Sequence, residues 1–125
     1  MTKEGELGRI YKDGEVICLQ GEKSNNMFVI QSGRVEVIAE EGNQKVLLAV
    51  LKKDDIFGEM ALFDAAPRSA TVKASGEARV LSIDKRGFLR RVHEDPSLAF
   101  RLLQKMSQRI RDMNSQLIKL KDSKQ

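Results

Sequence analysis

The sequence predicts a mainly β fold, an antiparallel, jelly-roll-like, double-stranded β-roll followed by a short helix and a long C-terminal helix. From about residue 15 to residue 83, short β-rich runs alternate with turn signals. After residue 84, apolar residues recur at the three-and-four spacing of a helix. The 125 residues, 41% hydrophobic and 32% charged, fit one globular domain over 1–125 with the roll at about 10–83.

The predicted strands are short apolar runs separated by turn residues. In chain order they are 16–19, 27–31, 34–39, 46–51, 56–57, 70–74 and 78–83. Two interruptions, Ser32-Gly33 and Ser75-Gly76-Glu77, have turn composition, so we expect a tight hairpin at the first and a strand break at the second. The remaining turns are expected at Gly21, 41–43 and 52–55. Frequent turns between short strands favour an antiparallel roll over alternating strands and helices.

Two helices are expected after the roll. Asp84 is a suitable N-cap for a short helix at about 85–93, although Gly87 weakens that helix. Asp95-Pro96 places an N-cap residue before a proline at the first helical position, which is typical of a new helix start. The second helix is predicted to run from about 97 to 121.

The long helix carries an apolar seam with heptad spacing. Its members are Leu103, Met106, Ile110, Met113, Leu117 and Leu120. Such a seam either packs on the roll of the same chain or pairs with a second copy. We expect a parallel homodimer, because the C-terminal half of the seam extends beyond what a small roll would cover.

The cysteine and histidine content excludes several classes of site. Cys18 is the only cysteine and His93 the only histidine, so neither an intrachain disulfide nor a His/Cys metal cluster can form. We expect no metal and no cofactor, and a reducing cytoplasm is the natural location. No apolar run approaches the roughly 20 residues of a membrane span, and residues 1–5 lack the apolar region of a signal peptide.

Charge is distributed unevenly along the chain. Residues 1–84 hold 11 Lys and Arg against 14 Asp and Glu, a net charge of −3, whereas residues 85–125 hold 11 against 4, a net charge of +7. The basic C-terminal part raises the alternative of a DNA-binding protein. No helix-turn-helix pattern follows residue 121, so we expect no nucleic-acid binding by this chain alone. The sequence leaves open whether the chain is a complete sensor or a piece of a longer protein.

The segment 57–72 carries the richest chemistry in the chain. Gly58 leads into a predicted helical turn whose free N–H groups favour an anion. Glu59 is an acceptor suited to a sugar hydroxyl, and Arg68 offers a planar fork of donors suited to a phosphate. Ser69 adds a hydroxyl, and Pro67 stiffens the approach. Each residue alone is ordinary, but together they predict a pocket for a ribose phosphate.

This segment resembles a known family motif. The run F-G-E-x-A-L-x-x-x-x-P-R-S-A-T-V is similar to the phosphate-binding cassette of cyclic nucleotide-binding domains, which occur in the bacterial catabolite activator family, protein kinase A regulatory subunits and cyclic nucleotide-gated channels. Upstream, residues 13–22 and 27–37 resemble the first two hairpins of these domains. The resemblance covers roughly residues 10–85, with the three motifs in the family's order.

The resemblance implies a role for each matching residue. Gly58 and the backbone of Met60 and Ala61 would contact ribose or phosphate, and Glu59 would bind the ribose 2′-hydroxyl. Arg68 would pair with the cyclic phosphate.

The residues after the cassette arginine complete the implied site. Ser69 would add hydroxyl and backbone contacts, with the Ala70 N–H beside it. Since no catalytic group appears among these residues, the resemblance implies binding and not catalysis.

The ligand's base is less well specified. In the family, a serine after the cassette arginine is commoner in cyclic AMP binders, so Ser69 favours cyclic AMP over cyclic GMP. Candidate base contacts are Leu48 in the roll and Met113, Asn114 and Ser115 in the last helix. We expect the ligand signal to leave through that helix. The alternatives are a dimerisation module with an empty pocket and a DNA binder that uses the basic helices.

Overall fold

The structure, a computed structural model, describes residues 7–64 and 66–123. The ends of the predicted 1–125 domain and residue 65 of the cassette lie outside this part. In chain order the elements are β1 (Arg9–Tyr11), β2 (Val16–Cys18), β3 (Met27–Glu41), β4 (Gln44–Lys52), β5 (Ile56–Phe57), the 3₁₀ turn η1 (Glu59–Leu62), β6 (Thr71–Ile83), α1 (Lys85–Glu94) and α2 (Ser97–Ser123).

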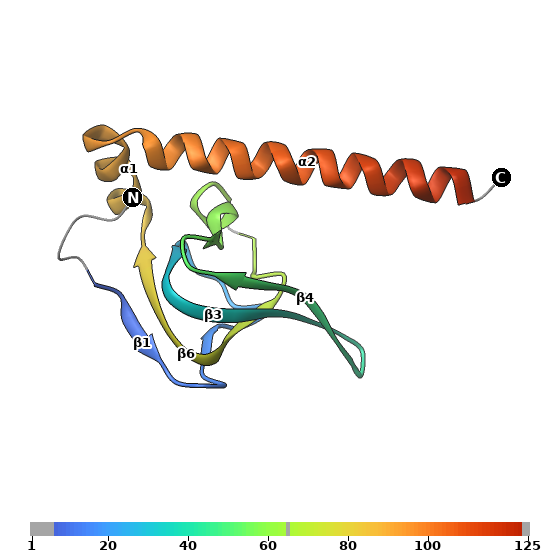
Figure 1. The fold of residues 1–125 in the computed structure, drawn as a ribbon, viewed down its shortest axis with the longest axis horizontal. Helices are drawn as coiled ribbons and strands as arrows, with labels where there is room; N and C mark the ends of the chain where they lie inside the picture. The colour runs from blue at the N-terminus through green and yellow to red at the C-terminus, as the bar shows by residue number, and fades with distance from the viewer. Residues whose placement is uncertain (1–6, 65, 124–125) are drawn as a thin grey trace. The chain divides into compact units, whose positions relative to one another are not determined.

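Two long strands organise the sheet. β6 pairs with β1, β2 and β3, and β3 pairs with β4 and β5 as well, every pairing being antiparallel. The resulting order is β1-β6-β3-β4, and Figure 1 shows β3 and β6 curving past one another. This arrangement confirms the predicted mainly β fold with a short and a long C-terminal helix.

The predicted hairpin at Ser32-Gly33 is wrong, because β3 continues through it from Met27 to Glu41. Gly33 has a φ of 79°, and a β-carbon there would collide with the Glu77 carbonyl on the paired strand. The register moves from Ser32 opposite Arg79 to Arg34 opposite Ser75, which is an irregularity of the bulge kind. The glycine therefore bends a strand and does not end one.

The predicted break at Ser75-Gly76-Glu77 is wrong for the same reason. β6 runs unbroken from Thr71 to Ile83, with Gly76 at a φ of 74° opposite the bulge of β3. The irregularities in β3 and β6 face each other and allow the two long paired strands to coil. A turn-like composition in the sequence does not distinguish such a bulge from a true turn. β1, at Arg9–Tyr11, was missing from the predicted strands.

The other predicted boundaries are confirmed closely. Gly42 turns the chain between β3 and β4 with a φ of 63°. The Asp84 carboxylate accepts a hydrogen bond from the Gly87 N–H at 2.6 Å, and the Asp95 carboxylate accepts one from the Ser97 N–H at 3.1 Å. Both aspartates therefore cap helices as expected. α1 ends one residue and α2 two residues beyond the predicted limits.

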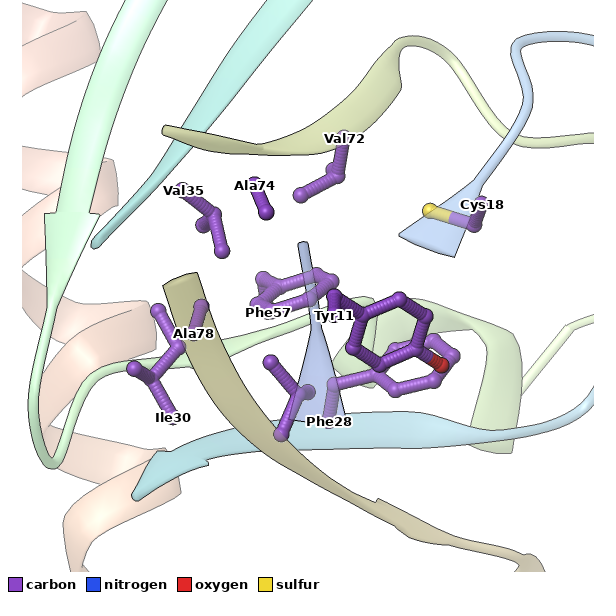
Figure 2. Packing of buried hydrophobic residues seen from close by; sticks show 10 residues of the cluster. Tyr11, Cys18, Phe28, Ile30, Val35, Phe57, Val72, Ala74 and Ala78 are labelled. Atoms are coloured by element: carbon purple, nitrogen blue, oxygen red, sulfur yellow. The ribbon is translucent and has the colours of Figure 1, made fainter. Parts of the chain in front are cut away.

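A hydrophobic core lies within the roll. Figure 2 shows side chains from β1, β2, β3, β5 and β6 gathering in one cluster. Its buried members are Tyr11, Cys18, Phe28, Ile30, Val35, Phe57, Val72, Ala74, Ala78 and Val80. Phe28 and Phe57 stack with their ring centroids 4.9 Å apart. Phe57 directly precedes Gly58, so this stack anchors the start of the cassette.

The chain divides into two compact units, with the boundary after Phe88, inside α1. In the second unit, α2 exposes most of the predicted seam. Leu103, Ile110, Met113, Leu117 and Leu120 are 58–63% exposed, and Met106 is half-buried. None of the described helices is long and apolar enough to cross a membrane.

Candidate functional site

The cassette begins with a glycine in a left-handed conformation. Gly58 has φ 74° and ψ 14°, and it leads directly into η1, a single 3₁₀ turn that starts at Glu59. The Gly58 carbonyl accepts a hydrogen bond from the Ala61 N–H at 3.2 Å. A β-carbon on residue 58 would lie 2.5 Å from Nη1 of Arg68. Glycine is therefore required here by both the backbone conformation and the neighbouring guanidinium.

Arg68 is buried, with 8% of its surface exposed, and three acceptors hold its guanidinium. Nη1 donates to the Gly58 carbonyl at 3.1 Å, and Nη2 donates to the Asn26 carbonyl at 2.6 Å and to the Ser24 hydroxyl. The guanidinium carbon lies 5.5 Å from the centroid of the Phe28 ring, within cation–π range. Arg68 Nε is buried and, among the described residues, has no hydrogen-bond partner.

Glu59 lies one residue beyond the glycine that contacts Arg68, and only 2% of its surface is exposed. Glu59 and Arg68 are the buried charged residues of the described chain. Burying charge costs free energy unless partners or a ligand compensate. Two buried charged groups beside a glycine in the left-handed conformation make this part of the roll the candidate functional site.

The other predicted cassette residues differ in exposure. Ala61 and Ala70 are buried, while Met60 and Ser69 are exposed. The structure thus brings Gly58 into direct contact with Arg68 and places Glu59, Met60 and Ala61 in the adjoining turn. The ligand contacts of all seven residues remain predictions.

The predicted base contacts come from both units. Leu48 lies on β4 of the roll and is 56% exposed. It has no partner in the β3–β4 register, which steps from Val37 opposite Ala49 to Ile38 opposite Leu47. Leu48 is therefore a bulge residue, whose side chain is re-aimed relative to a regular strand. Met113, Asn114 and Ser115 are exposed on α2, and their contact with a base stays a prediction.

The sequence prediction missed the segment that supports Arg68. Ser24 and Asn26, which accept hydrogen bonds from its side chain, lie 44 and 42 residues earlier in the chain. Phe28, below the guanidinium, was assigned only to a strand. The polar run Glu22–Asn26 before a buried strand was the one available signal, and it resembles any surface loop.

Cys18 lies near this charge inside the core. Burial raises the pKa of the Cys18 thiol above its ordinary value, while the positive charge of Arg68 opposes that shift. The raised pKa and the burial make the thiol an unreactive group of the core.

A cavity of about 560 Å³ opens on the roll beside the segment that supports Arg68. Ser24, Asn26 and Phe28 line it, together with residues of β1 and the end of β6. Gly58, Glu59 and Arg68 are not among its lining residues. The lining residues Ser24, Asn26 and Phe28 nevertheless contact the Arg68 guanidinium. Asn26 and Ser82, two lining side chains, are hydrogen-bonded to each other at 2.8 Å. Residues 7–64 and 66–123 contain no group of three or more His, Cys, Asp or Glu able to hold a metal ion.

Comparison with known proteins identifies relatives of this chain. A CRP-like cAMP-activated global transcriptional regulator of Mycobacterium tuberculosis is 28% identical over 109 residues, covering 86% of this chain and 48% of the regulator. A cAMP-dependent protein kinase regulatory subunit of Debaryomyces hansenii is 41% identical over 81 residues, covering 65% and 17%. The crystal structure of the Thermus thermophilus catabolite activator protein superposes with a TM-score of 0.81 at 29% identity, covering 90% of this chain and 53% of that one.

The chain spans about half the length, or less, of these relatives. The cyclic nucleotide-binding domain family matches this chain over residues 8–95, which is well over half of the chain and includes the whole cassette. The match also contains the segment that supports Arg68. This chain belongs to the cyclic nucleotide-binding domain family.

Proposed function

We propose that this protein binds a 3′,5′-cyclic nucleotide, cyclic AMP in preference to cyclic GMP, as a regulatory module without catalytic activity. The observation that carries the proposal is the buried Arg68 guanidinium. Three acceptors hold its terminal nitrogens, while the buried Nε has no partner among the described residues. Such an arrangement presents a fixed positive charge with a donor to spare, which suits a phosphate.

The neighbouring residues support the same ligand. The Glu59 carboxylate would accept a hydrogen bond from the ribose 2′-hydroxyl, and the exposed Ser69 hydroxyl would reach the phosphate or the base. Gly58 permits close approach of the backbone because it carries no side chain. A cyclic phosphate bears a single negative charge in a compact ring. A linear 5′-monophosphate carries more charge and an open geometry, so it would bind more weakly.

Calorimetry with cyclic AMP and cyclic GMP tests the proposal. We expect the wild type to bind cyclic AMP more tightly than cyclic GMP. Arg68→Ala removes the charged partner of the phosphate, which should cost about 2–5 kcal/mol of binding free energy. Arg79→Ala is the matched control, because Arg79 also donates to a backbone carbonyl, that of Gly8 at 3.0 Å, but lies outside the cassette. No binding of either nucleotide at millimolar concentration would refute the proposal.

The base preference needs a separate measurement. Ser69→Ala should weaken cyclic GMP more than cyclic AMP if the hydroxyl reaches the guanine amino group. Tighter binding of cyclic GMP than of cyclic AMP by the wild type would contradict the assigned preference.

The nucleotide is a ligand of the site, and we propose no cofactor there. We propose a cytoplasmic location, which suits a chain whose single cysteine, Cys18, is buried as a free thiol.

We further propose that the signal leaves through α2 and that the protein is a parallel homodimer along this helix. The support is the exposed seam, whose apolar side chains gain most by pairing with an identical stripe. Ligand would then shift the equilibrium between helix positions by its differential affinity for them. The alternatives, DNA binding and a dimer with an empty pocket, predict salt-dependent duplex binding and indifference to nucleotide.

Sedimentation tests the dimer. Ile110→Asp combined with Leu117→Asp places charge in the seam and should leave a monomer. Gln104→Asp combined with Gln116→Asp adds the same charge at exposed positions outside the seam and should leave the dimer intact. A wild type that stays monomeric at tens of micromolar, with and without cyclic AMP, would rule the dimer out.

A further inference from the structure

A short segment far from the cassette encloses Arg68 on its backbone and on its side chain. This segment, residues 21–26, is here called the Arg68 clasp. The Gly21 N–H donates to the Arg68 carbonyl at 2.8 Å, and the Arg68 N–H donates to the Glu22 carbonyl at 2.9 Å. Farther along, the Ser24 hydroxyl and the Asn26 carbonyl accept from Nη2. The clasp thus fixes both ends of the arginine.

The clasp is itself anchored in the sheet. The Asn26 side chain donates to the Ser82 hydroxyl of β6 at 2.8 Å, and the next residue, Met27, is fully buried at the start of β3. The Asn26 carbonyl therefore has a fixed position. Among the described residues, Ser24 contributes the one side-chain acceptor on the guanidinium, so it is the part of the clasp that a substitution can remove without disturbing the backbone.

The hydrogen-bond capacity of the guanidinium defines what Ser24 does. A guanidinium has five N–H groups, two on each terminal nitrogen and one on Nε. Both Nη2 hydrogens are engaged, by Ser24 and Asn26, and Nη1 donates to Gly58. With its ends fixed, the planar group cannot rotate, and its orientation over the Phe28 ring sets where the buried Nε–H points. Without the Ser24 hydroxyl, one Nη2 hydrogen loses its acceptor and only the Asn26 and Gly58 carbonyls hold the group, so its orientation is less firmly fixed.

We infer that Ser24 is a positioning residue for ligand binding, whose hydroxyl holds the Arg68 guanidinium in the orientation that meets the phosphate. This inference rests on the proposed cyclic nucleotide site. Ser24 acts through Arg68 and makes no contact with the ligand itself. Its contribution is preorganisation, since a guanidinium already fixed loses less freedom when the nucleotide binds.

Calorimetry with cyclic AMP on three variants tests the inference. Ser24→Ala should bind roughly tenfold more weakly, the effect of losing part of one hydrogen bond to a charged group. Ser24→Thr keeps the hydroxyl and should stay close to the wild type. Asn25→Ala is the matched control, because Asn25 is an exposed neighbour in the same segment. If Ser24→Ala fails to fold, Ser24→Cys, with its weaker acceptor, replaces it and should lie between the wild type and a full loss.

A second ligand separates positioning from structural damage. Cyclic 2′-deoxy-AMP lacks the hydroxyl assigned to Glu59, so it should bind more weakly than cyclic AMP by the same factor in the wild type and in Ser24→Ala. A smaller factor in Ser24→Ala would mean that the whole site is disordered, and it would overturn the positioning role.

The remaining outcomes distinguish the inference from the proposed function. A wild type that binds no cyclic nucleotide would overturn both the proposed function and the positioning role of Ser24. A wild type that binds, beside a Ser24→Ala variant of equal affinity, would overturn the inference alone. Tighter binding by Ser24→Ala would also overturn it, because the hydroxyl would then compete with the phosphate for Nη2.

Discussion

Gly58→Ala would show whether residue 58 must remain without a side chain for Arg68 to reach its position. Residue 58 has a φ of 74°, which L-residues other than glycine adopt at a cost of about 1–2 kcal/mol. The new β-carbon would also lie 2.5 Å from Arg68 Nη1 and 3.3 Å from its Cζ, so the guanidinium would have to move. Movement breaks the hydrogen bond from Nη1 to the Gly58 carbonyl. A hydrogen bond to a charged group is worth about 1.5–3 kcal/mol.

Gly76→Ala is a closely matched control. Gly76 has the same φ of 74°, but a β-carbon there would meet no atom within 4 Å. The Gly76→Ala variant therefore has the backbone strain without the collision. Any stability gained because alanine restricts the unfolded chain is the same in both variants. We expect Gly76→Ala to lower the free energy of unfolding by about 1–2 kcal/mol and Gly58→Ala by about 2.5–5 kcal/mol.

Chemical denaturation measures the two unfolding free energies, and calorimetry measures cyclic AMP binding. Gly76→Ala should bind cyclic AMP like the wild type. Gly58→Ala should lose at least tenfold in affinity for cyclic AMP, because the new β-carbon displaces the Arg68 guanidinium. Equal destabilisation in the two variants would show that the contact with Arg68 contributes nothing. A Gly58→Ala protein with wild-type affinity would refute the claim that this glycine positions the guanidinium.

Three further predictions concern stability. Asp84→Ala removes the carboxylate that accepts the Gly87 N–H, so the free energy of unfolding should fall by about 1 kcal/mol, measured by thermal denaturation; an unchanged midpoint would contradict the cap. Ile30→Ala empties a fully buried position and should cost about 2–5 kcal/mol in urea denaturation, and a loss below 1 kcal/mol would mean that the core collapses around the gap. Burial raises the pKa of the Cys18 thiol in the folded protein. The stabilisation that the buried neutral thiol contributes is therefore complete at neutral pH, and it declines as the pH rises above the ordinary pKa of a thiol. Wild type should therefore lose more stability than Cys18→Ala between neutral pH and about pH 10, and parallel pH profiles would contradict this assignment.

Much of the fold could be predicted because its signals are local. The caps at Asp84 and Asp95 follow from the identities of a few adjacent residues, and the run 46–51 marks β4 by its own composition. The errors at Ser32-Gly33 and Ser75-Gly76-Glu77 arose because a glycine with positive φ serves a turn and a bulge equally well. Only the partner strand decides between them, since β3 and β6 keep pairing on both sides of each irregularity. A run as short as β1 carries too few residues for a periodicity to emerge.

For the site, the sequence by itself determined the cassette, because Gly58, Glu59 and Arg68 lie within eleven consecutive residues and their chemistry is legible in that order. Tertiary structure alone decided that Gly58 and Arg68 are in contact and that Ser24, Asn26 and Phe28 complete the arginine's surroundings. The physical reason is that a buried charge needs hydrogen-bond partners. A guanidinium taken out of water needs acceptors from whichever segment the fold brings beside it, and pairing across more than forty residues leaves no mark in the local sequence.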